Sequence, residues 1–295
     1  RGVYATGTVS SYPEVDELKG DESVGYIFEN VTNVVNIANP ILVNDATAKG
    51  QVAVLAQGTG AGMNVNGISV SGNNNTGVYS STGQTVTNNG TLTLGASTGD
   101  SSIGIYSRGG AVINNGVSTI GNNSLGIYGE GTSITTKDMT IGDKGVGLYL
   151  NNTALGQGDA IVNGNVSVGG NEAIGIQASN AKTYLQGDLT VGTGDSKGIF
   201  SENDGDVETT GDITVGSNSL GIYKNGNAEV KTATGKTITV ADDGYGVFAK
   251  GGAKVTNNSA VSVGKNGVGI YVDGNDLLST GNVTVADKGV GLLIK

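Results

Sequence analysis

The sequence of 295 residues contains no Cys, no His and no Trp. Without Cys, the chain has no thiol nucleophile and no disulfide framework. Without His, it lacks the usual partner of a catalytic Ser or Cys and a common ligand of zinc. We therefore expect no metal site and no cofactor, and we expect that the protein is not an enzyme.

Proline, positive charge and long apolar runs are also scarce. The 53 glycines follow no three-residue period and only two Pro accompany them, which excludes collagen. Arg1 and Arg108 are the only arginines and the formal net charge is -10, so a nucleic-acid partner is not expected. No apolar run reaches the roughly 18 residues of a membrane span. Because the chain begins with Arg1 and shows no signal peptide, we expect a piece of a longer protein.

Glycine is abundant because it opens a recurring phrase of Gly, an aliphatic residue and usually an aromatic residue. The copies recur about every 24 residues, a spacing typical of solenoid repeats. They are Gly77-Val78-Tyr79, Gly104-Ile105-Tyr106, Gly126-Ile127-Tyr128, Gly147-Leu148-Tyr149, Gly175-Ile176-Gln177, Gly198-Ile199-Phe200, Gly221-Ile222-Tyr223, Gly246-Val247-Phe248, Gly269-Ile270-Tyr271 and Gly291-Leu292-Leu293.

Two further phrases keep step with the first. One is aliphatic, Ser or Thr, aliphatic, as in Leu92-Thr93-Leu94, and a weaker one precedes it, as in Thr85-Val86-Thr87. Each phrase has the period-2 alternation of a short strand, and Asn, Asp and Gly between the phrases favour turns. One unit cannot bury its apolar face alone, whereas stacked units can. The pattern predicts an all-β fold, a three-sided parallel β-helix of about 12 coils with about 24 residues each.

Residues 1–62 fit the repeat less well than residues 63–295. Gly2-Val3-Tyr4 and Val24-Gly25-Tyr26 are degenerate copies of the first phrase, and short strands are expected on both sides of Pro40. We predict one continuous solenoid, with irregular coils over 1–62 and regular repeats over 63–295. Because no polar cap follows Gly291-Leu292-Leu293, we also expect the natural protein to continue, with more coils on at least one end.

Acidic residues gather near the N-terminus, beside Pro13. We interpret this segment as a solvated loop inserted at a corner, and a cation site is the alternative. The acids are Glu14, Asp16, Glu17, Asp21 and Glu22.

Alternation along the first phrase assigns the faces of its strand. The aliphatic residues are expected in the core, so the Gly and the aromatic residue are expected to point outward. Stacked coils would then form an outward row of rings beside a smooth strip of Gly, a groove suited to sugar rings or an extended peptide. The alternative is that the rings only stabilise the ladder. The candidate ligand-binding residues are Tyr106, Tyr128, Tyr149, Tyr223, Phe248 and Tyr271.

The second phrase predicts an outward row of hydroxyl groups. Its irregular spacing argues against a match to an ice lattice, and stacked Thr contacts are the expected role. The row comprises Thr93, Thr140, Ser167, Thr190, Thr214, Thr239, Ser262 and Thr284.

A polysaccharide-degrading enzyme is the remaining alternative, because some parallel β-helices are lyases or hydrolases. Glycoside hydrolysis requires two carboxylates at a fixed separation. Asp242 and Asp243 are the only adjacent Asp pair in the repeat region, and their place in a corner favours an ordinary turn. Arg108 stands alone among glycines and has no acidic cluster beside it in the sequence. The sequence therefore gives the enzyme little support.

The style of the repeats resembles that of the large outer-membrane autotransporter adhesins of fusobacteria, which are type V secreted proteins. The phrases that carry the resemblance are those such as Ile141-Gly142-Asp143-Lys144-Gly145-Val146-Gly147-Leu148-Tyr149, and it covers about residues 63–295. It implies a right-handed β-helix, forming a monomeric rod within the passenger of such a protein. It also implies tethering to the outer membrane of a bacterium only through a C-terminal translocator barrel, which this sequence lacks.

The resemblance implies an adhesin displayed on the bacterial cell surface, with a role in virulence. Its expected partners are surface glycans, galactose-type sugars among them, or protein receptors of host cells and other bacteria. No binding motif of that family transfers residue by residue, so the candidate residues rest on the row of rings. Loops at 11–23, 95–102 and 150–160 are further candidates for binding. The alternative within the same fold is a spacer that binds nothing itself.

Overall fold

The computed structural model describes residues 2–45, 47–154, 156–274 and 276–295. Over these residues it is an all-β solenoid of three parallel sheets, with about 13 turns of about 23 residues. This confirms the predicted fold class and is close to the predicted period. Nowhere in the described part does a helix have the length and apolar character needed to cross a bilayer. Handedness stays a prediction, as does one unbroken solenoid.

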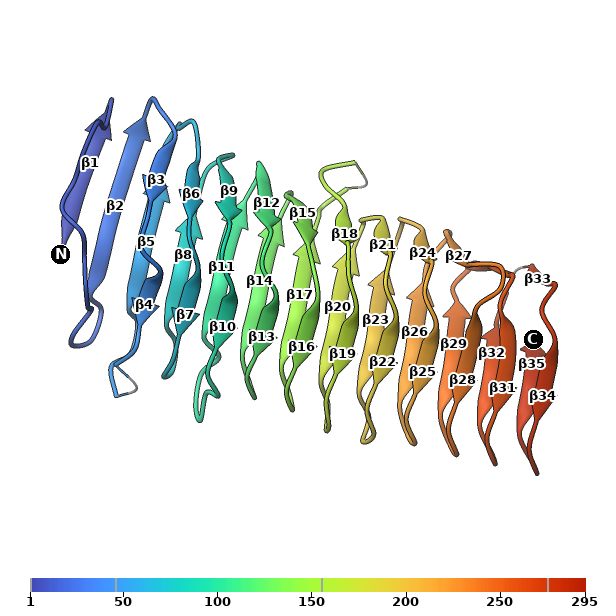
Figure 1. Cartoon of the computed structure of the whole chain (residues 1–295). Coiled ribbons are helices and arrows are strands. Elements are labelled where there is room, and N and C mark those ends of the chain that lie inside the picture. The colour runs from blue at the N-terminus through green and yellow to red at the C-terminus, as the bar shows by residue number, and fades with distance from the viewer. Residues whose placement is uncertain (1, 46, 155, 275) are drawn as a thin grey trace. The chain divides into compact units, whose positions relative to one another are not determined.

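The chain divides into two compact units, and each is described by itself. Unit 1 comprises residues 1–137 and 145–151, and unit 2 comprises 138–144 and 152–295. Each unit contains three parallel sheets, named A, B and C, and each full turn contributes one strand to every sheet in that order. Strands of one sheet in a unit follow one another turn by turn (Figure 1).

The strands of unit 1 belong to the first turns of the sequence. Sheet A contains β1 (Val3–Gly7), β2 (Val24–Val31), β5 (Val52–Gln57), β8 (Thr76–Ser80), β11 (Ile103–Arg108), β14 (Leu125–Glu130) and β17 (Val146–Asn151). Sheet B contains β3 (Val35–Ile37), β6 (Met63–Val65), β9 (Thr85–Asn88), β12 (Ala111–Asn114) and β15 (Ser133–Thr136). Sheet C contains β4 (Ile41–Val43), β7 (Ile68–Val70), β10 (Leu92–Leu94) and β13 (Ser118–Ile120).

The strands of unit 2 repeat the same order. Sheet A contains β20 (Ile174–Ser179), β23 (Lys197–Glu202), β26 (Leu220–Asn225), β29 (Tyr245–Lys250), β32 (Val268–Val272) and β35 (Val290–Ile294). Sheet B contains β18 (Ala160–Val162), β21 (Thr183–Leu185), β24 (Val207–Thr209), β27 (Glu229–Thr232), β30 (Lys254–Asn257) and β33 (Leu277–Ser279). Sheet C contains β16 (Met139–Ile141), β19 (Val166–Val168), β22 (Leu189–Val191), β25 (Ile213–Val215), β28 (Thr237–Val240), β31 (Ala260–Val263) and β34 (Val283–Val285).

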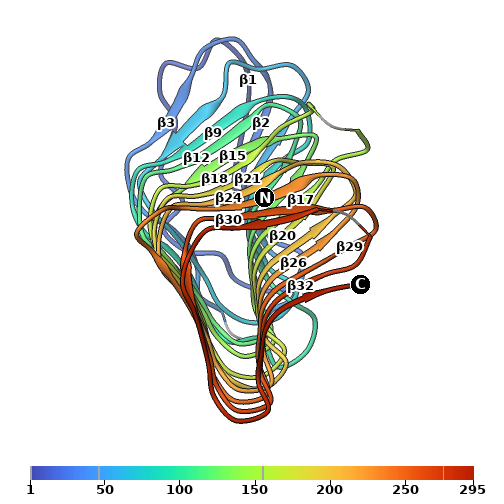
Figure 2. The same ribbon diagram turned by 90° about the vertical axis from the view of Figure 1, so that its right-hand side faces the viewer.

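Turn residues define the corners between the sheets. Many corners from sheet C to sheet A contain a residue with positive φ, such as Asn123 (φ 54°), Asn218 (φ 55°) or Asp243 (φ 58°). Asn and Asp adopt this left-handed conformation more readily than other residues with a side chain. Figure 2 shows the turns with their strands on the sides and these bends between them. The corners are therefore encoded by the polar residues between the three phrases.

The core of each unit is a stack of aliphatic side chains in register. On sheet A, Ile105 pairs with Ile127, and on sheet B Val112 pairs with Ile134. All four are fully buried. Burying one such side chain contributes about 1.5–3 kcal/mol, so the repetition of the phrases supplies most of the stability of the fold.

The segment 8–23 is not a loop inserted at a corner, and that expectation was wrong. It completes the first turn without any strand on sheets B and C, and it lies along the second turn. Val9 N donates to Asn33 Oδ1 at 2.8 Å, and the ring of Tyr12 contacts Tyr26 edge-on with 5.7 Å between centroids. Leu18 is buried. Leu18 and the ring of Tyr12 therefore hold the segment against the second turn.

The acidic residues of this segment are exposed, as expected for a solvated stretch. No group of three or more acidic side chains suited to a metal ion occurs among the residues that the structure describes. The cation site offered as the alternative therefore finds no support from geometry.

Candidate binding surface

The aromatic residues of the first phrase form a row on sheet A of each unit, here called the aromatic row. Tyr79, Tyr106 and Tyr128 pair with one another in register on β8, β11 and β14. Each ring is half-buried, while Ile105 and Ser107 on either side of Tyr106 are fully buried. The rings therefore point outward, as predicted. The row comprises Tyr79, Tyr106, Tyr128 and Tyr149 in unit 1, and Phe200, Tyr223, Phe248 and Tyr271 in unit 2.

The rings of unit 1 pack against one another in pairs. Tyr79 stacks on Tyr106 with 4.5 Å between centroids, and Tyr128 stacks on Tyr149 at 4.9 Å. Between the pairs, Tyr106 meets Tyr128 edge-on at 5.2 Å and 84°. Most ring faces are therefore covered by a neighbouring ring, and edges and hydroxyl groups face the solvent.

The rings of unit 2 form a longer stack. Phe200 stacks on Tyr223 at 4.7 Å, Tyr223 on Phe248 at 5.9 Å, and Phe248 on Tyr271 at 4.5 Å. Tyr245, which lies outside the row, meets Phe248 edge-on at 6.0 Å. Tyr223 lies between the rings of Phe200 and Phe248, and Tyr271 ends the stack beside Phe248.

A carboxylate lies beside the rings of unit 1. The Tyr128 hydroxyl donates to Glu130 Oε1 at 3.0 Å. Burial, together with this hydrogen bond, raises the pKa of Tyr128 to about 12. Burial and the charge of Glu130 also raise the pKa of Tyr106. Both hydroxyl groups therefore stay protonated near neutral pH and remain hydrogen-bond donors.

Charged groups also flank the rings of unit 2. The Nζ atom of Lys250 lies 5.4 Å from the centroid of Tyr223, in the range of a cation–π contact. Its hydrogen bond to Tyr223 raises the pKa of Lys250. The Tyr271 hydroxyl donates to Asp273 Oδ2 at 3.3 Å. The row thus combines apolar edges with polar groups of both signs.

The Gly residues do not form an outward strip, and that prediction was wrong. A Cβ atom on Gly104 would lie 2.6 Å from Leu92 Cδ1 and 2.6 Å from the carbonyl oxygen of Gly126. Gly104 therefore faces the core, where sheet A packs against sheet C, and both it and Ile105 are buried. The same contacts occur at Gly77, Gly126, Gly175, Gly198, Gly221, Gly246 and Gly269.

The physical reason is a departure from simple alternation at the start of these strands. Val146, which was expected in the core with Leu148 and Leu150, is only half-buried, and Gly147 is buried instead. At these positions glycine avoids a clash of a Cβ with the inner side chains of sheet C and with a carbonyl oxygen of the next turn. The groove with a glycine floor consequently does not exist, and the rings lie on an ordinary sheet face.

The predicted row of hydroxyl groups is present and exposed on sheet C. Thr93 pairs with Thr119 in unit 1, and in unit 2 Ser167 pairs with Thr190. The residues of the row are Thr93, Thr140, Ser167, Thr190, Thr214, Thr239, Ser262 and Thr284. This face is regular and uncharged, and it supplies a matched reference for the aromatic face.

The residues considered for catalysis have other contacts. Asp242 Oδ1 accepts a hydrogen bond from Lys265 N at 2.7 Å, and Asp243 adopts positive φ at its corner. Arg108 Nε lies 3.7 Å from Glu130 Oε2 in an exposed ion pair. These contacts match the interpretation of Asp242 and Asp243 as turn residues.

Two of the predicted loops are held by polar contacts. In the loop 95–102, Ser97 is buried and its hydroxyl donates to Gly72 O at 3.0 Å. In the loop 150–160, Asn152 Nδ2 donates to Gly158 O at 2.8 Å, while residue 155 lies outside the described residues. Ser97 therefore ties the loop 95–102 to the turn before it. The bond to Gly158 lies within the loop 150–160, and a second bond from Asn152 Nδ2 to Asn180 O at 3.3 Å ties that loop to the next turn.

Sequence reasoning missed Lys224, an inward residue of β26. Its side chain is fully buried, and Nζ donates to Asn203 O at 2.7 Å and to Ser201 Oγ at 3.2 Å. Burial lowers the pKa of Lys224 to about 8, although Asp204 and Asp206 oppose the shift. The signal in the sequence was a Lys at a position that is Ser201 and Ala249 in the paired strands.

The chain was also compared with known proteins. No family model, no curated protein and no solved structure matches it.

Proposed function

We propose that this chain is a segment of a bacterial surface adhesin and binds its partner through the aromatic row of sheet A. The observation that carries the proposal is the row itself, in which half-exposed rings repeat in register and polar groups lie beside them. Exposed aromatic surface of this kind often marks an interaction site. The partner is a glycan or a protein receptor on a host cell or another bacterium.

The geometry refines how such a partner would be held. Stacked neighbours cover the ring faces at 4.5–4.9 Å, so a ligand meets ring edges and phenol hydroxyls instead of stacking on a ring. Because Tyr128 donates its only hydroxyl proton to Glu130, the pair offers acceptors, on the phenol oxygen and the carboxylate, to the hydroxyl groups of a sugar or the N–H groups of a peptide. A scaffold of paired strands is rigid, which lowers the entropy lost on binding.

The same stacking favours a second candidate, a spacer without a ligand. Cross-strand aromatic pairs stabilise a sheet by about 0.2–1 kcal/mol each, which would explain the rings without any partner. The two candidates differ in one respect, because only the adhesin needs the outward edges of the rings for function.

Binding to a glycan array and to a panel of receptor ectodomains tests the proposal. The variant carrying Tyr128→Ala and Tyr223→Ala should lose a saturable signal. The matched control carries Thr93→Ala and Thr214→Ala, which remove outward side chains from sheet C, and it should bind like the unaltered protein. Equal loss in both variants would assign the signal elsewhere. No saturable signal from a folded protein would favour the spacer.

A further inference from the structure

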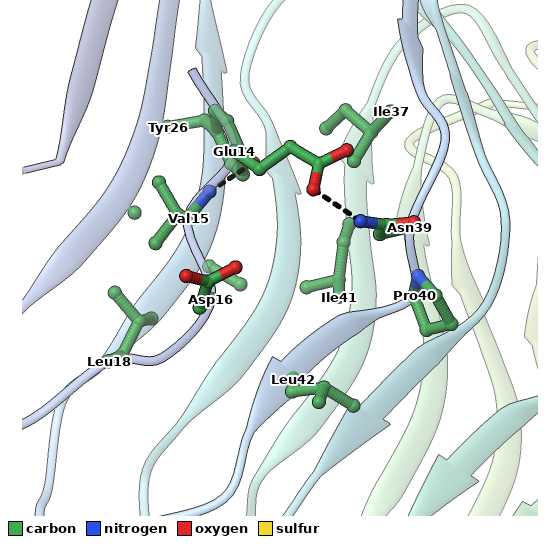
Figure 3. A pocket seen from close by; sticks show the side chains of 12 residues that line it. Glu14, Val15, Asp16, Leu18, Tyr26, Ile37, Asn39, Pro40, Ile41 and Leu42 are labelled. Carbon is green, nitrogen blue, oxygen red and sulfur yellow. Dashed lines mark hydrogen bonds between the residues drawn. The ribbon is translucent and has the colours of Figure 1, made fainter.

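An apolar pocket lies between the segment 8–23 and the second turn of unit 1, here called the N-terminal pocket (Figure 3). Leu18 borders it from the segment, and Ile37, Ile41 and Ala53 border it from the strands. Its volume of about 230 Å³ is several times the roughly 30 Å³ of a water molecule, so it admits an aliphatic side chain.

The pocket exists because the first turn has no strand on sheets B and C. In the regular turns a strand of the preceding turn covers each strand, whereas here an irregular segment passes over β3 and β4. The Tyr26 hydroxyl accepts a hydrogen bond from Val15 N at 2.7 Å, and Asn39 Nδ2 donates to Glu14. These two bonds hold the segment to the second turn on either side of the opening.

One side of the opening is the edge of a sheet. β4 ends sheet C, and within the described residues its strand partner is β7. Ile41 N donates to Gly67 O and Val43 O accepts from Ser71 N, so both residues face the β7 side. Because main-chain groups alternate along a strand, the N–H and C=O of Leu42 point to the opposite side. Leu42 also lines the pocket, and its side chain is 42% exposed.

The rim of the opening is negatively charged. Glu14 and Asp16 line the pocket, and Glu17, Asp21 and Glu22 are exposed on the same segment. Lys19 is the only cation between residues 8 and 23, and it pairs with Glu17 at 3.0 Å. Charge complementarity therefore favours a cationic occupant and disfavours an acidic one.

We propose that the N-terminal pocket binds a basic, extended peptide segment of a partner protein. The segment adds a short strand to β4 through the N–H and C=O of Leu42. An aliphatic side chain of the peptide enters the space between Leu18 and Ile41, and its flanking Lys or Arg side chains lie beside Glu14 and Asp16. Strand addition supplies main-chain hydrogen bonds, while the pocket and the rim select the sequence. This site is separate from the aromatic row.

Fluorescence anisotropy with labelled peptides on the whole chain tests the proposal. The probe is Lys-Ile-Lys-Val-Lys with blocked ends. One control is Glu-Ile-Glu-Val-Glu, which keeps the apolar residues, and the other is Lys-Ser-Lys-Ser-Lys, which keeps the charge. We expect saturable binding of the probe and at least tenfold weaker binding of both controls. Equal binding of the probe and the serine peptide would overturn the proposal, because charge alone would then explain it.

Variants of the protein test the two contacts separately. Leu42→Pro removes the outward N–H, and Pro is tolerated at a sheet edge. Leu42→Ala shortens the side chain and keeps the N–H. Probe binding should be at least tenfold weaker for the Pro variant than for the Ala variant. Because a folding defect in the Leu42→Pro variant would also abolish binding, the double change Glu14→Gln and Asp16→Asn provides an independent test at exposed positions. The double variant should bind the probe at least fivefold more weakly than the unaltered protein, and unchanged affinity would refute the assigned site.

Discussion

The second turn and the regular turns of unit 1 share one register but place their aromatic residues on opposite faces. Tyr26 pairs with Val54, and Phe28 pairs with Ala56, at inward positions that hold Ile105 and Ser107 further along the sheet. Tyr26 and Phe28 are 5% and 2% exposed. In the regular turns of unit 1 these two inward positions of sheet A hold small or aliphatic side chains, and the rings lie outside.

The difference shows how the fold is closed at an irregular segment. A regular turn is covered by its neighbour through matched strands, so Ser107 and Ile105 fill the interior. The second turn pairs with β1 on sheet A, but on the other two sides it faces the segment 8–23, which has no strand, and two large rings lie inside. The ring of Tyr12 reaches Phe28 from that segment with 5.6 Å between centroids. Side-chain size therefore compensates for the missing strands.

The largest expected effect comes from removing an inward ring. Phe28→Ala would leave a cavity in a buried position and should lower the free energy of unfolding by about 4 kcal/mol. Urea unfolding followed by circular dichroism measures it. A loss below about 1 kcal/mol would mean that the ring does not fill the interior. Phe28→Leu is the matched control and should cost about half as much.

Lys224 occupies the inward position in unit 2 that corresponds to Phe28 in unit 1. We expect it to make the free energy of unfolding depend on pH. Its pKa is about 8 in the folded protein and ordinarily 10.5, so the unfolded chain binds the proton more tightly between these values. The free energy of unfolding should therefore rise between pH 8 and 10.5, by on the order of 3 kcal/mol.

The pH effect is isolated by comparing two variants. Lys224→Met removes the titrating group, and its stability should lack this rise. Lys231→Met changes an exposed position of β27. This variant should keep the rise in the free energy of unfolding, and it contains the same tyrosines as the Lys224→Met variant. Identical pH profiles for the two variants, measured by urea unfolding, would contradict the assignment of the shift to Lys224.

A smaller effect is expected from the inward Gly positions. Gly104→Ala places a Cβ against a main-chain oxygen and should cost about 2 kcal/mol. Ala53 holds the equivalent position on β5. Ala53→Gly should lower the free energy of unfolding by only about 1 kcal/mol, because Gly loses more conformational freedom on folding. Thermal unfolding of the two variants compares them. A stabilised Gly104→Ala variant would show that the glycine is dispensable.

The smallest expected effect comes from an outward ring. Tyr128→Ala removes stacking on Tyr149 but opens no cavity, so it should cost about 1 kcal/mol. Tyr128→Phe keeps the stack and should cost less, which separates the ring from its hydrogen bond to Glu130. Both are measured by urea unfolding. A loss as large as that of Phe28→Ala would place the outward rings among the core residues.

The candidate binding surface was predictable in part. Because Tyr106 and Tyr128 follow buried aliphatic residues, their outward direction could be read from alternation. The outward direction predicted for Gly104 was wrong, because alternation carries no information about how closely sheet C approaches the start of a sheet A strand. Alternation also places Glu130 on the same face as Tyr128, two residues away, although the sequence analysis did not name it.

The sequence by itself determined the solenoid, its three sheets and the outward rows, because each depends on residue types that repeat at a fixed period. Only the tertiary structure decided which unrepeated residues are buried. Tyr26, Phe28 and Lys224 stand at inward positions where the paired strands have aliphatic or small residues, and their burial depends on which neighbouring turn or segment covers them. The N-terminal pocket has the same origin, since it is formed between Leu18 and Ile41, which are distant in the sequence and are brought together by the stacking of two unlike turns.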